Sequence, residues 1–291
     1  IGWLAVHVAC NDIATCGAQV RWILPLVLVP SISDEDLLEK IMRDVARAAD
    51  ELNVAIIGGH TGYSANLSRP LVAVTALGVL TDRQPILTRG AQVGDHILIT
   101  KGIALEGTAI LANDFHKTAR ELGLSQMDID EARRLMGAVS VLRVAEILAQ
   151  HGATSMHDVT RGGLLETLLE TSSLSDVGIQ VHFDRIPIPA VVDRFGEAFD
   201  FDPLKMISSG TLVVTISPED LEGAMVKLEA QGILCADIGE VIPGQGVKVV
   251  KHNQILYYQE IHPEDDELAR LWTQYAPDGD KPIEDSEFAT G

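Results

Sequence analysis

The chain has 291 residues and a formal net charge of −20, with 42 acidic against 22 basic side chains. This balance excludes a nucleic-acid phosphate groove or an anionic membrane surface as the partner, because like charges repel. The length suffices for two domains, each with its own core. The longest apolar run, residues 22–30, is too short to cross a membrane and is broken by prolines.

Three cysteines, Cys10, Cys16 and Cys235, occur without a CxxC pair or a metal-ligand spacing. An odd number of cysteines without a disulfide framework is typical of the reducing cytoplasm, so we expect a cytoplasmic protein. Free cysteine behaves as a small hydrophobe, and we expect all three to be packing residues. The chain begins at Ile1 and shows no signal peptide, so we expect it to start inside a longer sequence.

Helical and strand patterns alternate along the chain. The predicted helices lie at 33–52 with Ser33 as cap, 128–152, 188–198 and 218–232. The predicted strands lie at 54–59, 69–80, 95–102, 178–183, 210–216 and between 236 and 258. This pattern predicts an α/β unit followed by an α+β unit.

A boundary at residues 82–90 separates a smaller first unit from a larger second one. We divide the chain into a domain at 1–86, a domain at 87–258 and an acidic extension at 259–291. From residue 260 onward, ten acidic residues face two basic ones, a net charge of −8. The extension is rich in proline and acid, which predicts a solvated segment with one short helix around 268–272.

Two polar residues, Asn11 and Asp12, stand in the otherwise apolar stretch "ACNDIATCGA". A buried carboxylate costs several kcal/mol unless it is paired or bound to a cation. Asp12 therefore either caps a turn or meets a metal ion, and the residues alone leave both interpretations open.

Two further segments place polar or glycine residues after strands. The strand predicted at 54–59, which we expect to be buried, runs into a glycine turn with Gly58, Gly59, His60 and Thr61, and loops at strand ends of α/β folds favour ligands such as phosphate. Lys101 ends the next strand but one, in "ITKGIALEGTAILAND", with Glu106 and Thr108 near a helix start. Each segment has a plain alternative: an ordinary turn for the glycines, a solvated side chain for the lysine.

The most informative stretch is "SMHDVTRGGLLETLLE", residues 155–170. A helix N-terminus is a natural anion seat, glycines let its backbone approach a ligand, and Arg161 is suited to a bidentate phosphate contact. The alternative is an ordinary helix capped by Asp158 or Thr160.

Taken in order, "IGWLAVHVACNDIATCGA", "IIGGHTGY", "GDHILITKGIALEGTAILA" and "SMHDVTRGGL" resemble the aminoimidazole ribonucleotide (AIR) synthase superfamily. That superfamily includes selenophosphate synthetase, thiamine-monophosphate kinase and the hydrogenase-maturation carbamoyl dehydratase. The resemblance runs from residue 1 to about 258 and is closest to the carbamoyl dehydratase branch. It implies an N-terminal α/β domain whose sheet is shared in a dimer, a C-terminal α+β domain, and ATP in the cleft between them.

The resemblance also implies roles for individual residues. Asn11 and Asp12 match the family's Asn–Asp pair, whose aspartate helps to hold Mg²⁺ on the nucleotide phosphates. The glycine turn of the nucleotide site is matched by Gly58, Gly59 and Thr61. The C-domain motif at the phosphate end of the cleft is matched by Asp158, Thr160, Gly162 and Gly163.

Three departures from the family pattern stand out. The family's glycine-rich, aspartate-bearing first segment precedes the position of Ile1, so we expect the ATP site to be incomplete in this chain. His60 stands where several branches carry an acid. The carbamoyl dehydratase ends in a reactive cysteine, whereas this chain ends "EFATG" and Cys235 lies in a predicted strand. We therefore expect this protein not to perform that dehydration.

The sequence predicts an ATP-dependent enzyme that phosphorylates an oxygen of a small or peptide-borne substrate, with ATP and Mg²⁺ as cofactors. Phosphoryl transfer needs positioning and charge neutralisation, which isolated aspartates, glycine turns and a cation such as Lys101 supply. The alternative is a non-catalytic nucleotide-binding or scaffold protein that retains the fold. The expected partner is a second copy of the chain, with neither nucleic acid nor membrane involved.

Overall fold

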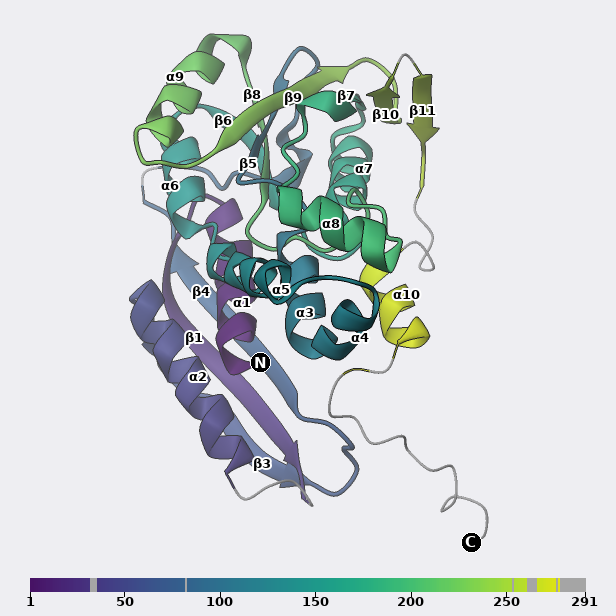
Figure 1. The fold of residues 1–291 in the computed structure, drawn as a ribbon. Helices are drawn as coiled ribbons and strands as arrows, with labels where there is room; N and C mark the ends of the chain where they lie inside the picture. The colour runs from purple at the N-terminus through teal and green to yellow at the C-terminus, as the bar shows by residue number, and fades with distance from the viewer. Residues whose placement is uncertain (32–35, 82, 253, 261–265, 276, 278–291) are drawn as a thin grey trace, which may run out of the picture.

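The computed structural model describes residues 1–31, 36–81, 83–252, 254–260, 266–275 and 277. Two units follow one another along the chain, a smaller one built on a short sheet and a larger one built on a long sheet (Figure 1). The mixed α/β and α+β composition confirms the predicted fold class. Within the described residues, no helix is long and apolar enough to cross a membrane.

The N-terminal unit consists of α1 (Gly2–Thr15), β1 (Gln19–Pro30), α2 (Leu37–Leu52), β2 (Ala55–Ile56), β3 (His60–Ser64) and β4 (Leu71–Val79). The central strand β1 pairs in parallel with β2 and β3 on one edge and antiparallel with β4 on the other. Both helices pack on one face of this sheet, where alternate residues of β1 such as Ile23 and Val27 are fully buried. The helix α2 begins after Asp36, and the expected cap Ser33 lies outside the described residues.

The C-terminal unit is built on a seven-stranded sheet in the order β11-β10-β7-β9-β5-β8-β6. Its strands are β5 (His96–Thr100), β6 (Ala153–Asp158), β7 (Gly178–His182), β8 (Leu212–Ile216), β9 (Cys235–Ile242), β10 (Gly246–Lys251) and β11 (Gln254–Tyr258). Its α-helices are α3 (Leu105–Asp114), α4 (His116–Glu121), α5 (Gln126–Arg134), α6 (Leu142–Gln150), α7 (Gly163–Ser175), α8 (Ala190–Phe199), α9 (Pro218–Glu229) and α10 (Glu267–Gln274). Short 3-10 turns lie at Thr88–Gly90, Leu135–Ala138 and Phe183–Arg185.

The two units share a hydrophobic core. Val6 and Cys10 of α1 belong to the same buried cluster as Leu98 of β5, Leu148 of α6 and Val214 of β8. The helix α1 therefore lies between the N-terminal sheet and the C-terminal unit, as Figure 1 shows. A side chain on this helix is placed to reach either unit.

One long helix predicted over 128–152 is wrong. The segment is divided into α5, a 3-10 turn and α6, with a non-helical stretch at residues 139–141. That stretch is bonded to distant side chains: Asn11 binds the backbone of Val139 and Val141, and Lys101 binds the carbonyl oxygens of Ala138 and Ser140. Backbone groups that are engaged by tertiary partners cannot complete a helical ladder.

The short helix expected near 268–272 is confirmed as α10. It packs against the helical layer of the C-terminal unit, with Leu271 fully buried and the Trp272 ring at 5.1 Å from the Phe115 ring. Two other predictions are wrong: β2 is exposed rather than buried, and His60 and Thr61 lie within β3 instead of a loop.

Candidate functional site

Two carboxylates approach each other where the units meet. Asp12 lies in the last turns of α1, and Asp158 ends β6. Burial raises the pKa of Asp158 to about 6, and the negative charge of Asp12 adds to this effect. Desolvation also raises the pKa of Asp12, although that residue is exposed in the single chain rather than buried as its apolar sequence surroundings suggested. The sequence positions are 146 residues apart, so only the fold brings the pair together.

Neither the Asp12 nor the Asp158 carboxylate has both of its oxygens hydrogen-bonded to described residues. The Oδ2 atom of Asp158 is buried and has no hydrogen-bond partner among the described residues. At Asp12 it is the backbone carbonyl, not the carboxylate, that accepts the Thr15 hydroxyl at 2.8 Å. The structure therefore does not support Asp12 as a side-chain turn cap. An unpartnered buried carboxylate oxygen beside a second carboxylate is what a bound cation would complete.

His157 places a positive charge beside this pair. Its Nε2 lies 2.9 Å from a carboxylate oxygen of Glu170, and its Nδ1 lies 2.6 Å from the carbonyl oxygen of Asp158. Both neighbours are acceptors, so the ring binds best when both nitrogens carry a proton. Burial alone lowers the pKa of His157, but the bonds to Glu170 and Asp158 outweigh burial and raise the pKa. His157 belongs to the motif at 155–170, and no role was predicted for it.

Glu106 is the residue that sequence reasoning undervalued. It lies in the first turn of α3, is 3% exposed, and accepts the backbone N–H of Ser209 at 3.2 Å. Burial raises its pKa, and its charge contributes to the raised pKa of Asp158. Nearby in the sequence, the Thr108 hydroxyl is buried without a hydrogen-bond partner among the described residues. An acidic residue near the start of an otherwise apolar helix is the signal by which the sequence could have revealed Glu106.

The glycine motif forms the start of α7 without a side-chain cap. Gly162 is the N-cap with φ at 72°, and Gly163 has φ at 69°. A Cβ at Gly163 would lie 2.5 Å from the carbonyl oxygen of Leu204, so only glycine fits there. Capping by Asp158 or Thr160 is therefore wrong. Thr160 instead accepts the Gly163 N–H through its carbonyl oxygen.

Arg161 does not point at the carboxylates in this structure. Its Nε lies 3.0 Å from Oδ2 of Asp266, the residue that caps α10, and the arginine side chain is 65% exposed. The contact ties the glycine motif to the C-terminal helix. The phosphate contact expected for Arg161 stays a prediction.

Asn11 and Lys101 serve as a clamp on the stretch between α5 and α6. The fully buried Asn11 donates from Nδ2 to the Val139 carbonyl and accepts the Val141 N–H, both at 2.9 Å. The Lys101 Nζ donates to two carbonyl oxygens at 2.7 and 2.6 Å, and burial lowers its pKa to about 8. These donors hold backbone, and their predicted nucleotide contacts stay predictions.

The other glycine turn lies apart from the carboxylates. Gly58 and Gly59 join β2 to β3 at the sheet edge, and a Cβ at Gly59 would lie 2.2 Å from the Pro25 carbonyl oxygen. Thr61 pairs with Val27 in the parallel ladder. Among the described residues, no hydrogen bond or charge interaction links this turn to Asp12 or Asp158. The fold of one chain therefore does not unite all the predicted site residues.

No preformed metal cage accompanies the carboxylates. Within the part of the chain that the structure describes, no group of three or more His, Cys, Asp or Glu side chains could hold a metal ion. Two carboxylates alone suit Mg²⁺ that also binds phosphate oxygens and water.

Both units match known sequence families. Residues 1–80 match the N-terminal domain of the AIR synthase related proteins, and residues 92–252 match the C-terminal domain. The chain belongs to this family. The family likeness predicted from the motifs is thus confirmed.

Individual relatives lie in the branch expected from the motifs. The chain is 33% identical to carbamoyl dehydratase HypE of Cupriavidus necator, covering 83% of this chain and 68% of that protein. It is 29% identical to a putative hydrogenase expression/formation protein of Methanocaldococcus jannaschii, covering 76% of this chain and 64% of that protein. The chain thus spans about two thirds of the length of these curated relatives.

A solved structure extends the likeness to the fold. The crystal structure of hydrogenase maturation protein HypE in complex with ATP superposes with a TM-score of 0.75 at 25% identity. The superposition covers 91% of this chain and 81% of that one. Both units are therefore arranged as in a family member that has been solved with a nucleotide.

Proposed function

We propose that this protein binds Mg–ATP at the Asp12–Asp158 pair and phosphorylates an oxygen of a small or peptide-borne substrate. The observation that carries the proposal is the buried Oδ2 of Asp158, which has no hydrogen-bond partner among the described residues, on a carboxylate whose pKa is also raised by the charge of Asp12. The likeness to HypE in complex with ATP supports the choice of nucleotide. The substrate is left at this chemical class.

The residues present fit a magnesium ion that bridges protein and phosphate. Asp12 and Asp158 would hold it, and the ion would supply positive charge to the phosphate oxygens. Desolvation raises the pKa of both carboxylates, and the charge of Asp12 raises that of Asp158 further; a bound cation would relieve both effects. No further protein ligand is required, since Mg²⁺ usually keeps several waters.

The remaining groups have separate roles in phosphoryl transfer. The protonated His157 ring, held by Glu170, contributes fixed positive charge near the phosphates. The N-terminus of α7 has no side-chain cap, and a helix N-terminus favours an anion such as phosphate. Glu106, whose charge acts on Asp158, is our proposed acceptor for the proton of an attacking hydroxyl or amide group. Such catalysis rests on positioning and charge rather than covalent chemistry.

A homodimer through the N-terminal sheet belongs to the same proposal. The face of this sheet away from α1 and α2 carries Trp22, Leu26 and Leu28 of β1 opposite Leu77, Ala73 and Leu71 of β4. Leu71 and Leu77 are 43% and 42% exposed in the single chain. An apolar sheet face of this kind is stable in water only when covered. The Gly58–Gly59 turn lies on an edge of this sheet, where a partner would bring new neighbours to it.

Light scattering tests the dimer. The wild-type chain should scatter as a dimer at micromolar concentration, and Leu26→Asp should scatter as a monomer because it buries a charge in the shared face. As a control, Leu234→Asp alters an exposed leucine of the C-terminal unit and should leave the mass unchanged. A monomeric wild type would contradict the shared sheet.

Calorimetric titration with ATP tests the nucleotide site. Binding should require Mg²⁺ and disappear in EDTA. Slow ADP release in the absence of any acceptor, with water as the nucleophile, would separate an enzyme from a scaffold that only binds nucleotide. Absence of ATP binding in both conditions would refute the proposal.

A further inference from the structure

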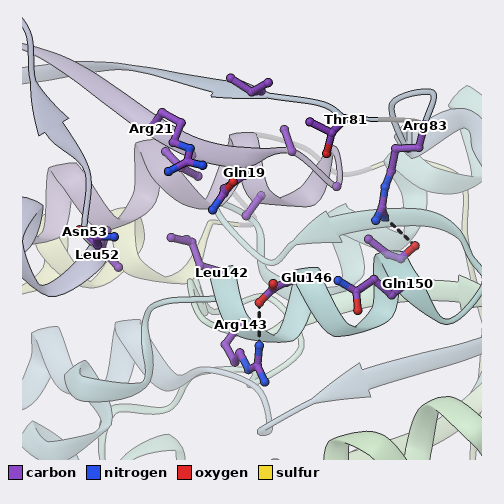
Figure 2. A pocket seen from close by; sticks show the side chains of 16 residues that line it. Gln19, Arg21, Leu52, Asn53, Thr81, Arg83, Leu142, Arg143, Glu146 and Gln150 are labelled. Carbon is purple, nitrogen blue, oxygen red and sulfur yellow. Dashed lines mark hydrogen bonds and ion pairs between the residues drawn. The ribbon is translucent and has the colours of Figure 1, made fainter.

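A hollow that does not include the Asp12–Asp158 pair lies at the boundary between the two units. It encloses about 390 Å³ between the start of β1, the end of α2, the residues Val79, Thr81 and Arg83, and the helix α6 (Figure 2). Both units contribute to its wall, but neither Asp12 nor Asp158 does. A volume in this range suits a small organic molecule.

The wall of this hollow is basic in a strongly acidic protein. Its charged residues are three arginines, Arg21, Arg83 and Arg143, against the single acid Glu146. Arg143 and Glu146 neutralise each other through an ion pair at 2.7 Å. Two arginines therefore remain uncompensated in a chain whose net charge is −20. An anion would find this wall attractive although the rest of the protein repels it.

Neither of these two arginines forms an ion pair with an acid among the residues that the structure describes. Arg83 donates one N–H to the Ala149 carbonyl at 2.7 Å, which fixes the guanidinium beside α6 and leaves its other donors. Arg21 makes no hydrogen bond or ion pair with any residue that the structure describes. A planar guanidinium with unused donors matches the geometry of carboxylate and phosphate.

Arg21 owes its position to an irregularity in β1. The register with β4 places Val20 opposite Gly78 and Trp22 opposite Leu77, so Arg21 is the extra residue of a β-bulge. Bulges re-aim a side chain and are common beside functional sites. The bulge explains why Arg21 lies in the wall of the hollow, although the strand pairing does not require an arginine there.

The rest of the lining offers hydrogen bonds around an apolar floor. Figure 2 shows Gln19, Thr81 and Gln150 around the hollow together with Arg83. The side chains of Gln19, Thr81 and Gln150 make no hydrogen bond to other described residues, so their donors and acceptors are available to a ligand. The floor is formed by Ala14, Ala18, Val20, Leu52, Val79, Leu142 and Ala149. Few polar groups over an apolar surface are typical of small-molecule sites.

We propose that this hollow is a second binding site, for a small organic anion with carboxylate or phosphate groups that are held by Arg21 at one end of the hollow and by Arg83 at the other. A ligand there contacts β1 and β4 of the first unit and α6 of the second, and so stabilises one arrangement of the two units. The site is independent of the proposed nucleotide function, because its lining shares no residue with the carboxylate pair.

Citrate and inorganic pyrophosphate serve as probes of the two anion classes, titrated into the full chain by calorimetry in EDTA and at constant ionic strength. At least one probe should bind, and Arg21→Ala and Arg83→Ala should each weaken that binding by about tenfold or more. Gln150→Glu removes no packing but adds an acid to the wall, and should weaken binding similarly. Arg43→Ala alters an exposed arginine outside the hollow and should have no effect. Asp12→Asn should also leave probe binding unchanged.

Two results would overturn the proposal. One is the absence of binding by both probes at concentrations up to about 10 mM, an affinity too weak for a specific site. The other is binding that Asp12→Asn removes while Arg21→Ala and Gln150→Glu leave it intact, which would place the anion at the nucleotide site. Failure of ATP to bind would affect neither result.

Discussion

Asn11 and Asp12 are consecutive in α1, yet they belong to two regions of the boundary between the units that differ in hydrogen bonding. In the clamp region, Asn11 and Lys101 donate to carbonyl oxygens between α5 and α6 over 2.6–2.9 Å. In the carboxylate region, formed by Asp12, Asp158 and Glu106, one buried carboxylate oxygen has no partner among the described residues.

The difference separates residues that hold the fold from residues that await a ligand. Buried polar groups are normally satisfied, so a satisfied amide is explained by structure alone. A buried carboxylate oxygen without a partner costs stability and needs another explanation. The family motif joins both types in one Asn–Asp pair, and only the structure assigns them different work. Substitutions in the two regions should therefore have opposite consequences.

The largest effect is expected in the clamp region. Asn11→Ala removes one donor and one acceptor and leaves two buried backbone groups of Val139 and Val141 unpaired. We expect the free energy of unfolding to fall by about 2–4 kcal/mol. Urea denaturation measures this. Asn113→Ala, at an exposed position with one bond inside its own helix, is the control and should cost well under half as much. An equal cost for both would refute the clamp.

The next largest effect, expected from Asp158→Asn, is an increase in the free energy of unfolding. Folding raises the pKa of Asp158 from 3.8 to about 6, so the folded state disfavours the ionised form. The contribution of this group to stability is full below about pH 4 and is lost as pH rises through about 6. Asp158→Asn removes that loss and should stabilise the nucleotide-free protein at pH 7, by on the order of 2–3 kcal/mol at most.

Denaturation at several pH values checks this prediction. The difference in unfolding free energy between Asp158→Asn and wild type should be small near pH 4 and grow toward pH 7. Mg–ATP binding by the same variant should be lost. A difference that does not depend on pH would show that ionisation of Asp158 in the folded state is not costly.

Local patterns were enough to predict much of the fold. The apolar runs at 69–80 and 210–216 became β4 and β8, and the pattern at 218–232 became α9 with Ser217 as its cap. Such elements follow from periodicity because they bury one continuous face. The helix predicted over 128–152 failed for a non-local reason: Asn11 is 128 residues away from the Val139 carbonyl that it binds. No local window contains that information.

The site shows the same division. The motifs identified Asp12 and Asp158, but the charge partner of His157 is Glu170 on α7 and the backbone donor to Glu106 is Ser209, 103 residues further along. The family resemblance also implied that the Gly58–Gly59 turn belongs to the nucleotide site, and this stays a prediction because no hydrogen bond or charge interaction links the turn to the carboxylates within the described residues. Motifs indicate which residues take part, whereas pairing and burial depend on the tertiary structure.

A smaller effect is expected from Asp12→Asn. The Asp12 carboxylate makes no hydrogen bond to the described residues and its charge disfavours ionised Asp158, so the change should raise the free energy of unfolding at pH 7 slightly, by less than about 1 kcal/mol. Mg–ATP binding should weaken by about tenfold or more, because an amide is a poorer magnesium ligand than a carboxylate. Calorimetric titration beside a melting curve separates the two. A lower melting temperature with unchanged affinity would return Asp12 to a structural role.

The smallest effect is expected from Arg161→Ala. The guanidinium is largely exposed and its partner is Asp266, the cap of α10. Surface ion pairs contribute about 0–1 kcal/mol, and Asp266 keeps its bond to the Ala269 N–H when the arginine is removed. The melting temperature should therefore change little, and addition of salt should reduce even that change. Calorimetry with Mg–ATP gives the decisive reading: unchanged affinity would leave Arg161 as a tie between the glycine motif and α10. A loss of about tenfold would mean that the arginine exchanges Asp266 for phosphate, and would extend the carboxylate region to the C-terminal helix.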